Sequence, residues 1–243
     1  MVASQMAGPA KKWPRIVVVA SVLCGSAFAF LTWSISHPSV QVLPLPATLI
    51  SLNAPEGREF RTRAEDRADL KALESHFEAQ KYATYCGVAS SVIALRTLGT
   101  SVSQDTFFDE DASAVRSPWA TFYMGMTVDQ LGDLLVAHGV TADVVHAGDT
   151  TVDDFRSAAR GNLSRAGDVM LVNYERSVVE QGSGGHISPV GAYDATSDRF
   201  LVMDVSAYKY PPVWMSTAAL FAAMNTQDAA SGATRGYVLV GTR

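Results

Sequence analysis

Three residues whose side chains could act together as a covalent catalyst lie far apart in this 243-residue sequence. Cys86 begins the segment CGVASSVIALRTLG, His186 follows the glycine-rich run QGSGG, and Asp204 lies in RFLVMDV. Val88, Val92 and Leu95 recur at helical spacing before Gly99, so Cys86 is predicted at the first turn of a core helix. The helix dipole and its free N–H groups would favour the thiolate there. An aspartate beside a histidine stabilises the imidazolium, which completes a nucleophilic triad.

The spacing of His186 and Asp204 predicts that the two side chains meet. HISPVGAY and RFLVMDV are typical of strands, and a short turn-forming segment, DATSD, joins them. A hairpin centred on Ala195 places His186 opposite Asp204, with both side chains on one face. A register error of one residue would separate them. Gln80, six residues before Cys86, could donate its amide N–H to an oxyanion.

Simpler interpretations of the same residues stay open. A lone buried cysteine is more often a small apolar residue, a strand histidine can simply bind a backbone carbonyl, and Asp204 could cap a turn. The glycine-rich run could be a flexible loop, whereas a phosphate-binding loop is disfavoured because no G-K-[ST] follows. The sequence has no CxxC, HExxH or other metal-ligand spacing. We therefore expect no metal site and no required cofactor.

The elements that must position the triad form an α+β pattern. A capping box, T-V-D-Q, begins a helix at Thr127 that ends at Gly139, and further helices are predicted from Thr151 and Ser216. Residues 65–80 are compatible with a helix. Strands are predicted at 168–174, 186–193, 199–205 and 237–242. Helices dominate the first half and an antiparallel sheet the second, so the fold class is α+β.

The first 57 residues differ from the rest. Residues 16–35 are apolar and uncharged, three basic residues precede them, and Ala27-Phe28-Ala29 fits a signal peptidase site. The same run is long enough to span a bilayer once. We expect residues 1–35 to be a cleaved signal peptide or an N-terminal membrane anchor. Residues 36–57, which are rich in proline, would be an extended linker strip packed on or leading into a domain at 58–243.

Charge and cysteine usage limit the partners. The net charge is −5, and residues 1–35 carry only basic charges, so the remainder is more acidic still. This argues against a nucleic-acid partner, and membrane contact is expected only through the N-terminal segment. Cys24 lies in the leader, which leaves Cys86 without a partner for an internal disulfide bond.

Two stretches carry a resemblance to a known family. QKYATYCGVASSVIALRTL (80–98) resembles the nucleophile segment of the phytochelatin synthases. GGHISPVGAYD and RFLVMDVSAYKYPPVWM resemble their histidine and aspartate segments. The resemblance runs from about Leu43 to Thr242 and is strongest to the short bacterial members. It implies a papain-like fold, with the nucleophile helix in an N-terminal helical half and an antiparallel sheet in the C-terminal half.

The resemblance also implies an activity and a set of site residues. The family transfers γ-glutamylcysteinyl groups from glutathione. Cys86 would be the nucleophile, His186 the base, Asp204 the orienting acid and Gln80 an oxyanion donor beside the Cys86 backbone N–H. The γ-glutamyl pocket would be lined by four residues, Asn173, Arg176, Gly185 and Arg235. An arginine suits the γ-glutamyl α-carboxylate because it can bind with two parallel hydrogen bonds.

The resulting expectation is cleavage of the Cys–Gly bond of glutathione through a γ-glutamylcysteinyl thioester. The plant enzymes continue into a cysteine-rich region, so here we expect mainly hydrolysis to γ-glutamylcysteine and glycine, with lesser phytochelatin formation. Heavy-metal ions such as cadmium would enter as thiolate complexes of the substrate, in a metal-detoxification response. The protein would be periplasmic or anchored to the inner membrane facing the periplasm. A homodimer is compatible with this expectation. Two alternatives stay open, an exported papain-like cysteine peptidase of other specificity and a non-catalytic anchored thiol protein.

Overall fold

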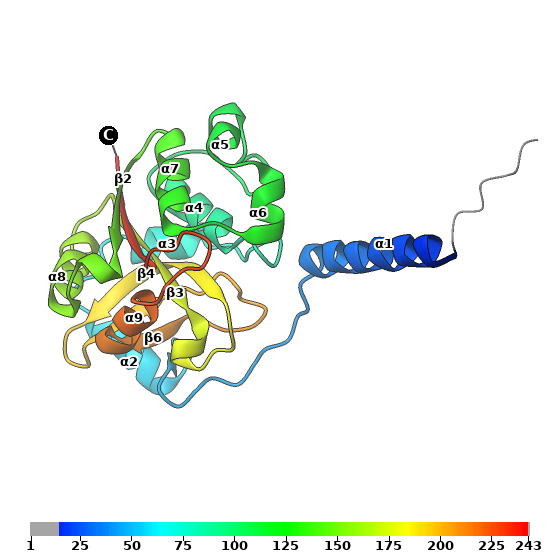
Figure 1. The fold of residues 1–243 in the computed structure, drawn as a ribbon. Coiled ribbons are helices and arrows are strands. Elements are labelled where there is room, and N and C mark those ends of the chain that lie inside the picture. Colours follow the sequence, from blue (N-terminus) through cyan, green and yellow to red (C-terminus); the bar gives the residue numbers. More distant parts are fainter. Residues whose placement is uncertain (1–14, 243) are drawn as a thin grey trace, which may run out of the picture.

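A computed structural model describes residues 15–242. Its centre is an antiparallel sheet with helices on both faces (Figure 1). All neighbouring strands in the sheet are antiparallel. Their order across the sheet is β1 (Ile50–Ser51), β6 (Val213–Ser216), β5 (Arg199–Val202), β4 (Gly185–Asp194), β3 (Asp168–Glu175), β7 (Gly236–Gly241) and β2 (Thr141–His146). The predicted α+β class is confirmed.

The helices form a layer on each face of this sheet. One layer contains α2 (Pro55–Arg63), α3 (Leu70–His76), α4 (Cys86–Thr97) and α7 (Val128–Ala137), with α5 (Glu110–Val115) against α7. The other contains α8 (Val152–Leu163) and α9 (Thr217–Met224). The remaining elements are α1 (Arg15–Ser36), α6 (Pro118–Met124) and the short 3₁₀ turns η1 (Ala147–Asp149) and η2 (Arg176–Val179).

Residues on β3 alternate between two hydrophobic cores. Val169 and Leu171 pack with α4 and α7, whereas Met170 and Val172 pack with α8 and α9. This follows from the strand period of two, with both faces of the sheet covered. The α4 helix itself is buried on every side over residues 87–95, because it lies between the sheet and the neighbouring helices. Cys86 at its N-terminus is thereby fixed relative to β4.

The predicted helix boundaries are confirmed by their caps. The Thr127 hydroxyl accepts from the Gln130 backbone N–H, and the Gln130 side chain accepts from the Thr127 N–H. At α8 and α9 the hydroxyls of Thr151 and Ser216 accept from the backbone N–H groups of Asp154 and Ala219. Gly99 and Gly139 follow α4 and α7 with φ angles of 90° and 86°, which glycine adopts without strain.

Several predicted elements are shorter than expected. Only Leu70–His76 of the 65–80 segment is helical, because Asp66 instead forms an isolated bridge with Tyr193 and the chain is extended at Phe77. The strand predicted at 199–205 ends at Val202, because the Asp204 carboxylate accepts the Ser206 backbone N–H and turns the chain. The β1, β2 and β6 strands and the α2, α5 and α6 helices were not predicted.

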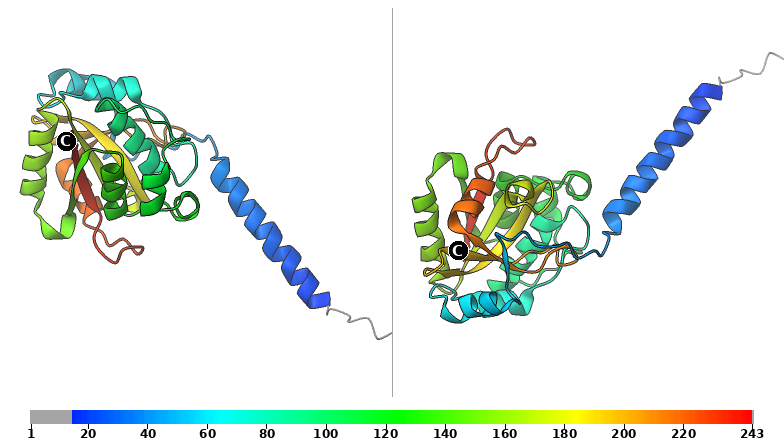
Figure 2. Two further views of the ribbon diagram at one scale, coloured as in Figure 1. Left: turned by 90° about the horizontal axis from the view of Figure 1, so that it is seen from above. Right: turned by 90° about the horizontal axis from the view of Figure 1, so that it is seen from below.

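The N-terminal part contacts the domain through the end of α1 and through the segment that follows it. Residues 37–49 contain no helix or strand, and Gln41 and Leu43 donate backbone hydrogen bonds to Tyr208 and Lys209. Figure 2 shows α1 projecting away from the sheet and its helices. Within the part of the chain that the structure describes, no helix combines the length and apolar character needed to cross a membrane. The predicted leader at 1–35 begins in residues 1–14, which lie outside that part, and it stays a prediction.

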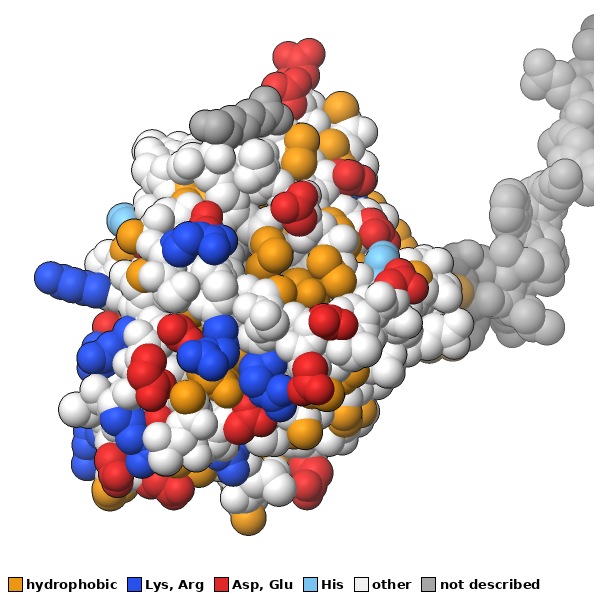
Figure 3. All heavy atoms as spheres, turned by 90° about the vertical axis from the view of Figure 1, so that its left-hand side faces the viewer, with side chains coloured by type: hydrophobic (Ala, Val, Ile, Leu, Met, Phe, Trp, Pro, Cys, Tyr) orange, Lys and Arg blue, Asp and Glu red, His pale blue; other side chains and the backbone are white. Residues whose placement is uncertain are grey.

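The face that carries α8 has mixed charge. Figure 3 shows acidic and basic side chains interspersed over this face. Arg156 contacts Asp153 and Asp198, and Arg160 contacts Asp66 at 2.8 Å. Alternating signs of this kind produce no extended basic surface on this side of the molecule.

Candidate active site

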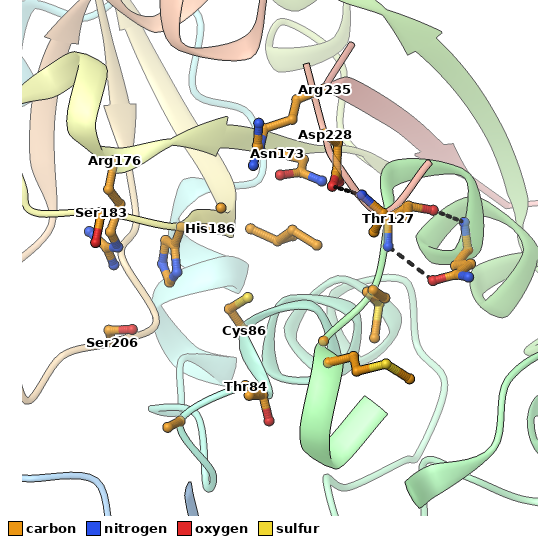
Figure 4. A pocket seen from close by; sticks show the side chains of 18 of the residues that line it. Thr84, Cys86, Thr127, Asn173, Arg176, Ser183, His186, Ser206, Asp228 and Arg235 are labelled. Carbon is orange, nitrogen blue, oxygen red and sulfur yellow. Dashed lines mark hydrogen bonds between the residues drawn. The ribbon is translucent and has the colours of Figure 1, made fainter. Parts of the chain in front are cut away.

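A pocket of about 560 Å³ opens beside the N-terminus of α4 (Figure 4). Its walls include five regions: the entry to α4, the segment between α6 and α7, the adjoining ends of β3 and β4, the segment between β5 and β6, and the loop before β7. The lining residues discussed below are Cys86, Met126, Asn173, Arg176, Gly185, His186, Ser206, Asp228 and Arg235. The pocket thus contains six of the eight predicted site residues; Asp204 and Gln80 lie behind its wall.

Cys86 is the first residue of α4 and its side chain is partly exposed. The thiol lies close enough to the His186 ring and to the Ile187 backbone for both to lower its pKa. Tyr85, the residue at the N-cap, places no side-chain oxygen on the first N–H groups of the helix. Those N–H groups therefore stay available beside the sulfur, where they can stabilise negative charge.

His186 connects Cys86 to Asp204. It is the second residue of β4, it is 3% exposed, and its ring packs edge-on against Tyr174 at 5.7 Å between centroids. His186 Nε2 lies 2.9 Å from Oδ1 of the fully buried Asp204, an ion-pair distance without the alignment of a good hydrogen bond. The structure therefore brings the three residues of the predicted triad together.

The register that joins His186 to Asp204 differs from the predicted one. β4 and β5 pair Asp194 with Arg199, and an irregularity between Val190 and Ala192 shifts the pairing to Val190 with Val202. Continued past the end of β5, this register would place Ser188 opposite Asp204. His186 is then a diagonal neighbour, two residues away on the same face. The predicted hairpin centre is wrong, yet a two-residue error preserves the face that a one-residue error would have lost.

The charges of the triad stabilise one another. Burial raises the pKa of Cys86, but the adjacent, positively charged His186, with smaller effects of Ile187 and Arg176, leaves that pKa below its ordinary value. Burial and Arg176 lower the pKa of His186, but the charge of Asp204 and the contacts with Asp204 and Cys86 leave it raised. Despite burial, His186 and Arg176 lower the pKa of Asp204 to about 2. These shifts favour a thiolate–imidazolium pair over a neutral thiol and imidazole.

Gln80 lies behind the triad rather than in the pocket. Its Nε2 group donates to the Tyr82 carbonyl at 2.9 Å and the Ala83 carbonyl at 2.7 Å, and it lies 3.0 Å from the Tyr208 hydroxyl. Its Oε1 accepts from the Ser206 hydroxyl at 2.7 Å. Both amide hydrogens are therefore in use in this structure, and donation to an oxyanion would require one of these bonds to break. The predicted oxyanion role stays a prediction.

Arg176 is buried against the triad. Its Nη2 donates to Asp204 Oδ1 at 2.9 Å and lies 2.8 Å from Oδ2, and its Nη1 donates to Gln181 Oε1 at 2.7 Å. The guanidinium also lies over the Tyr210 ring, 5.1 Å from its centroid. Its position in the pocket wall fits the prediction, but its charge is compensated by Asp204.

The other three predicted pocket residues, Asn173, Gly185 and Arg235, lie close together in the pocket wall. Asn173 on β3 is 3% exposed, and its side chain points into the pocket in Figure 4. Arg235 Nη2 lies 3.0 Å from Glu175 Oε2, and Nη1 donates to the Gln227 carbonyl at 2.8 Å, whereas its buried Nε has no hydrogen-bond partner. A Cβ on Gly185 would lie 3.1 Å from that Nε. Glycine there leaves room beside an unused donor.

Comparison with known proteins identifies the family. The model for phytochelatin synthase matches residues 40–237. This chain belongs to the phytochelatin synthase family. Among curated relatives, glutathione gamma-glutamylcysteinyltransferase 3 of Lotus japonicus is 31% identical over 209 residues, which covers 82% of this chain and 43% of the relative. The predicted family is confirmed.

Two other relatives give the same picture. Glutathione gamma-glutamylcysteinyltransferase 1 of Triticum aestivum is 31% identical, with 84% of this chain and 42% of the relative covered. The glutathione gamma-glutamylcysteinyltransferase of Schizosaccharomyces pombe is 30% identical, with 81% and 50% covered. The chain spans about half the length of the curated relatives it matches, or somewhat less.

Two pocket residues of this phytochelatin synthase family member were missed in the sequence. Ser206 joins Asp204 to Gln80, since its N–H donates to the first and its hydroxyl to the second. Asp228 lies in the loop before β7, and Figure 4 shows it near Arg235 and Thr127. The only local signal for Ser206 was its spacing of two from Asp204, which suits a side-chain turn. The polar loop around Asp228 has no periodicity that predicts a site. Among the described residues, no cluster of His, Cys, Asp and Glu could hold a metal ion.

Proposed function

We propose that this chain is a glutathione γ-glutamylcysteinyltransferase-like enzyme with a papain-like catalytic arrangement. The observation that carries the proposal is the Cys86–His186–Asp204 triad at the N-terminus of α4, beside a pocket that contains Arg235, Asp228 and Asn173. The names of the relatives support the substrate class. A γ-glutamyl group ends in an α-carboxylate and an α-ammonium, which require a cationic and an anionic partner.

The polar wall of the pocket suits those two groups. The unpartnered Nε of Arg235 can donate to the α-carboxylate, and the nearby Asn173 amide can donate a second hydrogen bond. The Asp228 carboxylate, which also accepts the Ala230 N–H at 3.0 Å, can accept from the α-ammonium. This arrangement would hold the cysteinyl carbonyl of glutathione towards Cys86.

In the proposed reaction the Cys86 thiolate attacks the carbonyl carbon of the Cys–Gly bond. The Cys86 backbone N–H, one of the free groups of the helix N-terminus, donates to the oxyanion. The C–N bond then breaks, the glycine nitrogen takes the proton of His186, and a γ-glutamylcysteinyl thioester remains. Water, deprotonated by His186, attacks the thioester and yields γ-glutamylcysteine and free Cys86. Attack by a second glutathione instead yields the two-repeat phytochelatin.

Hydrolysis is proposed as the main outcome. Water is present at roughly 55 M, so an acceptor at millimolar concentration competes only when it is bound and oriented. No cofactor is needed for these steps, and a metal such as cadmium would enter as a thiolate complex of glutathione. The proposal also covers the location and assembly of the protein. Residues 1–35 would direct the export of this bacterial protein to the periplasm, or anchor it to the inner membrane facing the periplasm. The protein would be a homodimer.

Incubation of the full chain with glutathione tests the function. Stoichiometric release of glycine and γ-glutamylcysteine, with no cleavage of casein or of tetrapeptides that lack a γ-glutamyl group, is the expected result. Cleavage of those peptides at a comparable kcat/KM would instead support the peptidase alternative. Stoichiometric cadmium binding that survives His186→Ala, without glycine release in the parent protein, would support the thiol-protein alternative.

A further inference from the structure

Arg176 was predicted to line the γ-glutamyl pocket, but its guanidinium binds Asp204 of the triad. The two terminal nitrogens of its guanidinium bind Asp204 and Gln181, and its side chain is 8% exposed. Gln181 is 2% exposed and is itself fixed, because its N–H donates to the Arg176 carbonyl and its carbonyl accepts from the Tyr210 hydroxyl. The guanidinium is therefore oriented by the protein before any substrate binds.

The contact between Arg176 and Asp204 affects the net charge of the triad and its surroundings. When Cys86 is ionised, Arg176, Asp204, His186 and Cys86 carry alternating positive and negative charges, so the cluster is neutral. Without Arg176 the same cluster would carry one net negative charge, next to the buried His186 and Asp204. A buried charge without a partner is costly, and the cost would fall on ionisation of the thiol.

Geometry points the same way. Asp204 Oδ1 accepts from Arg176 Nη2 and from the Ser206 N–H, and it also lies 2.9 Å from His186 Nε2. Because Arg176 Nη2 lies within 2.9 Å of both carboxylate oxygens, the carboxylate loses rotational freedom that a contact with one oxygen would leave. We propose that Arg176 is a positioning residue that acts through Asp204, and that it is not a ligand of the substrate. This inference deepens the proposed function and rests on it only for the turnover measurement.

The test uses the pH dependence of Cys86 alkylation by iodoacetamide, which requires no glutathione. The full chain carries Cys24→Ser so that Cys86 alone reacts. Arg176→Met should lower the alkylation rate near pH 6 several-fold, because Arg176 binds Asp204 and its charge contributes to the lowered pKa of Cys86. In an Asp204→Asn background the same substitution should change the rate clearly less, because only the direct effect of the Arg176 charge on Cys86 then remains.

Two variants keep the comparison interpretable. Arg63→Met is the matched control, because Arg63 binds the buried Asp194 with donors at 2.7 and 2.8 Å at the far end of β4. It should leave the pH dependence of alkylation unchanged even if it lowers the melting temperature. If Arg176→Met does not fold, Arg176→Lys replaces it. The change in alkylation rate should then be smaller, but it should again be larger with Asp204 present than in the Asp204→Asn background.

Turnover gives the second measurement. A positioning role predicts that Arg176→Met lowers kcat for glycine release while KM for glutathione changes less than about twofold. Equal shifts of alkylation in both Asp204 backgrounds, or a raised KM at unchanged kcat, would overturn the inference while leaving the proposed function intact. A parent protein that alkylates as described but releases no glycine would overturn the function and leave the role of Arg176 standing.

Discussion

Arg176 and His186 contact the same carboxylate, that of Asp204, at 2.8 and 2.9 Å. The aspartate is fully buried, so its charge is balanced almost entirely by these two residues. The pocket also contains a second compensated cation, Arg235, paired with Glu175 at 3.0 Å. Local pairing of this kind explains how a chain of net charge −5 can present cationic donors to an anionic peptide.

The pH dependence of turnover should be bell-shaped. Activity should rise as Cys86 loses its proton, below the ordinary thiol pKa, and fall as His186 loses its proton, above the ordinary imidazole pKa. Asp204 raises the pKa of His186, so Asp204→Asn should move the alkaline limb to lower pH. Profiles of kcat/KM for glycine release measure both limbs. An alkaline limb that stays in place in Asp204→Asn would show that His186 is not the group that titrates.

Removal of either reacting side chain should abolish glycine release. Cys86→Ser and His186→Ala should each lower kcat by about 10³-fold or more, because the nucleophile and its base act as a unit. Asp204→Asn should cost less than either, since it makes and breaks no bond. Initial rates of glycine release measure the three variants, with melting temperatures as the control for folding. A Cys86→Ser variant with more than about a tenth of the parent rate is incompatible with a covalent mechanism.

Arg235→Lys should raise KM for glutathione by about tenfold despite the conserved charge. A lysine cannot reproduce three contacts that the guanidinium makes at once, to Glu175, to the Gln227 carbonyl and, as proposed, to the substrate α-carboxylate. Arg160→Lys, on the α8 face with Asp66 as its partner, is the matched control and should leave KM unchanged. Steady-state kinetics of both variants decide the matter, and an unchanged KM in Arg235→Lys would mean that the α-carboxylate binds elsewhere.

Gly87→Ala should affect the pocket more than the fold. A Cβ at position 87 would lie 2.5 Å from the Met126 sulfur, the far end of a flexible side chain that lines the pocket. Methionine can move aside, so the melting temperature should fall by only a few degrees for a cost of about 1 kcal/mol. The displaced Met126 should raise KM several-fold. If Met126→Ala in the same chain does not restore the KM, the contact is not the cause.

Four helices, α4, α7, α8 and α9, and the nucleophile at the start of α4 could be predicted from the sequence because they depend on local patterns. The caps at Thr127, Thr151 and Ser216 lie within one turn of the groups they bind, and Cys86 starts a helix with a clear apolar period. These signals require no knowledge of distant contacts.

The rest depended on tertiary contacts. The strand irregularity next to Gly191, which shifts the β4–β5 register, has a weak local sign in the glycine itself, where a Cβ would lie 2.8 Å from Leu70 Cδ1. The partners of Arg176 and Gln80, by contrast, are set by side chains up to 128 residues away. The predicted role of Arg176 came from resemblance alone and that of Gln80 from its spacing to Cys86 and from resemblance, and neither source conveys hydrogen-bond partners.

The product ratio should depend on the glutathione concentration. At low millimolar glutathione, γ-glutamylcysteine should predominate, and the share of two-repeat phytochelatin should rise with concentration as the acceptor competes with water. Added cadmium should change the total rate little. Chromatography of the products at several concentrations, with and without cadmium, gives the ratio. Predominant phytochelatin at low glutathione, only when metal is added, would contradict hydrolysis as the main reaction while leaving the triad unaffected.

Mass spectrometry of the full chain, quenched in acid after brief exposure to glutathione, tests covalent catalysis by Cys86 most directly. The expected result is a γ-glutamylcysteinyl group on Cys86 that lacks the glycine. Hydroxylamine should remove this group, and the His186→Ala variant should not accumulate it. An unmodified Cys86 under turnover, or a whole glutathione that a reducing agent removes, would contradict the thioester mechanism, since the second adduct is a mixed disulfide.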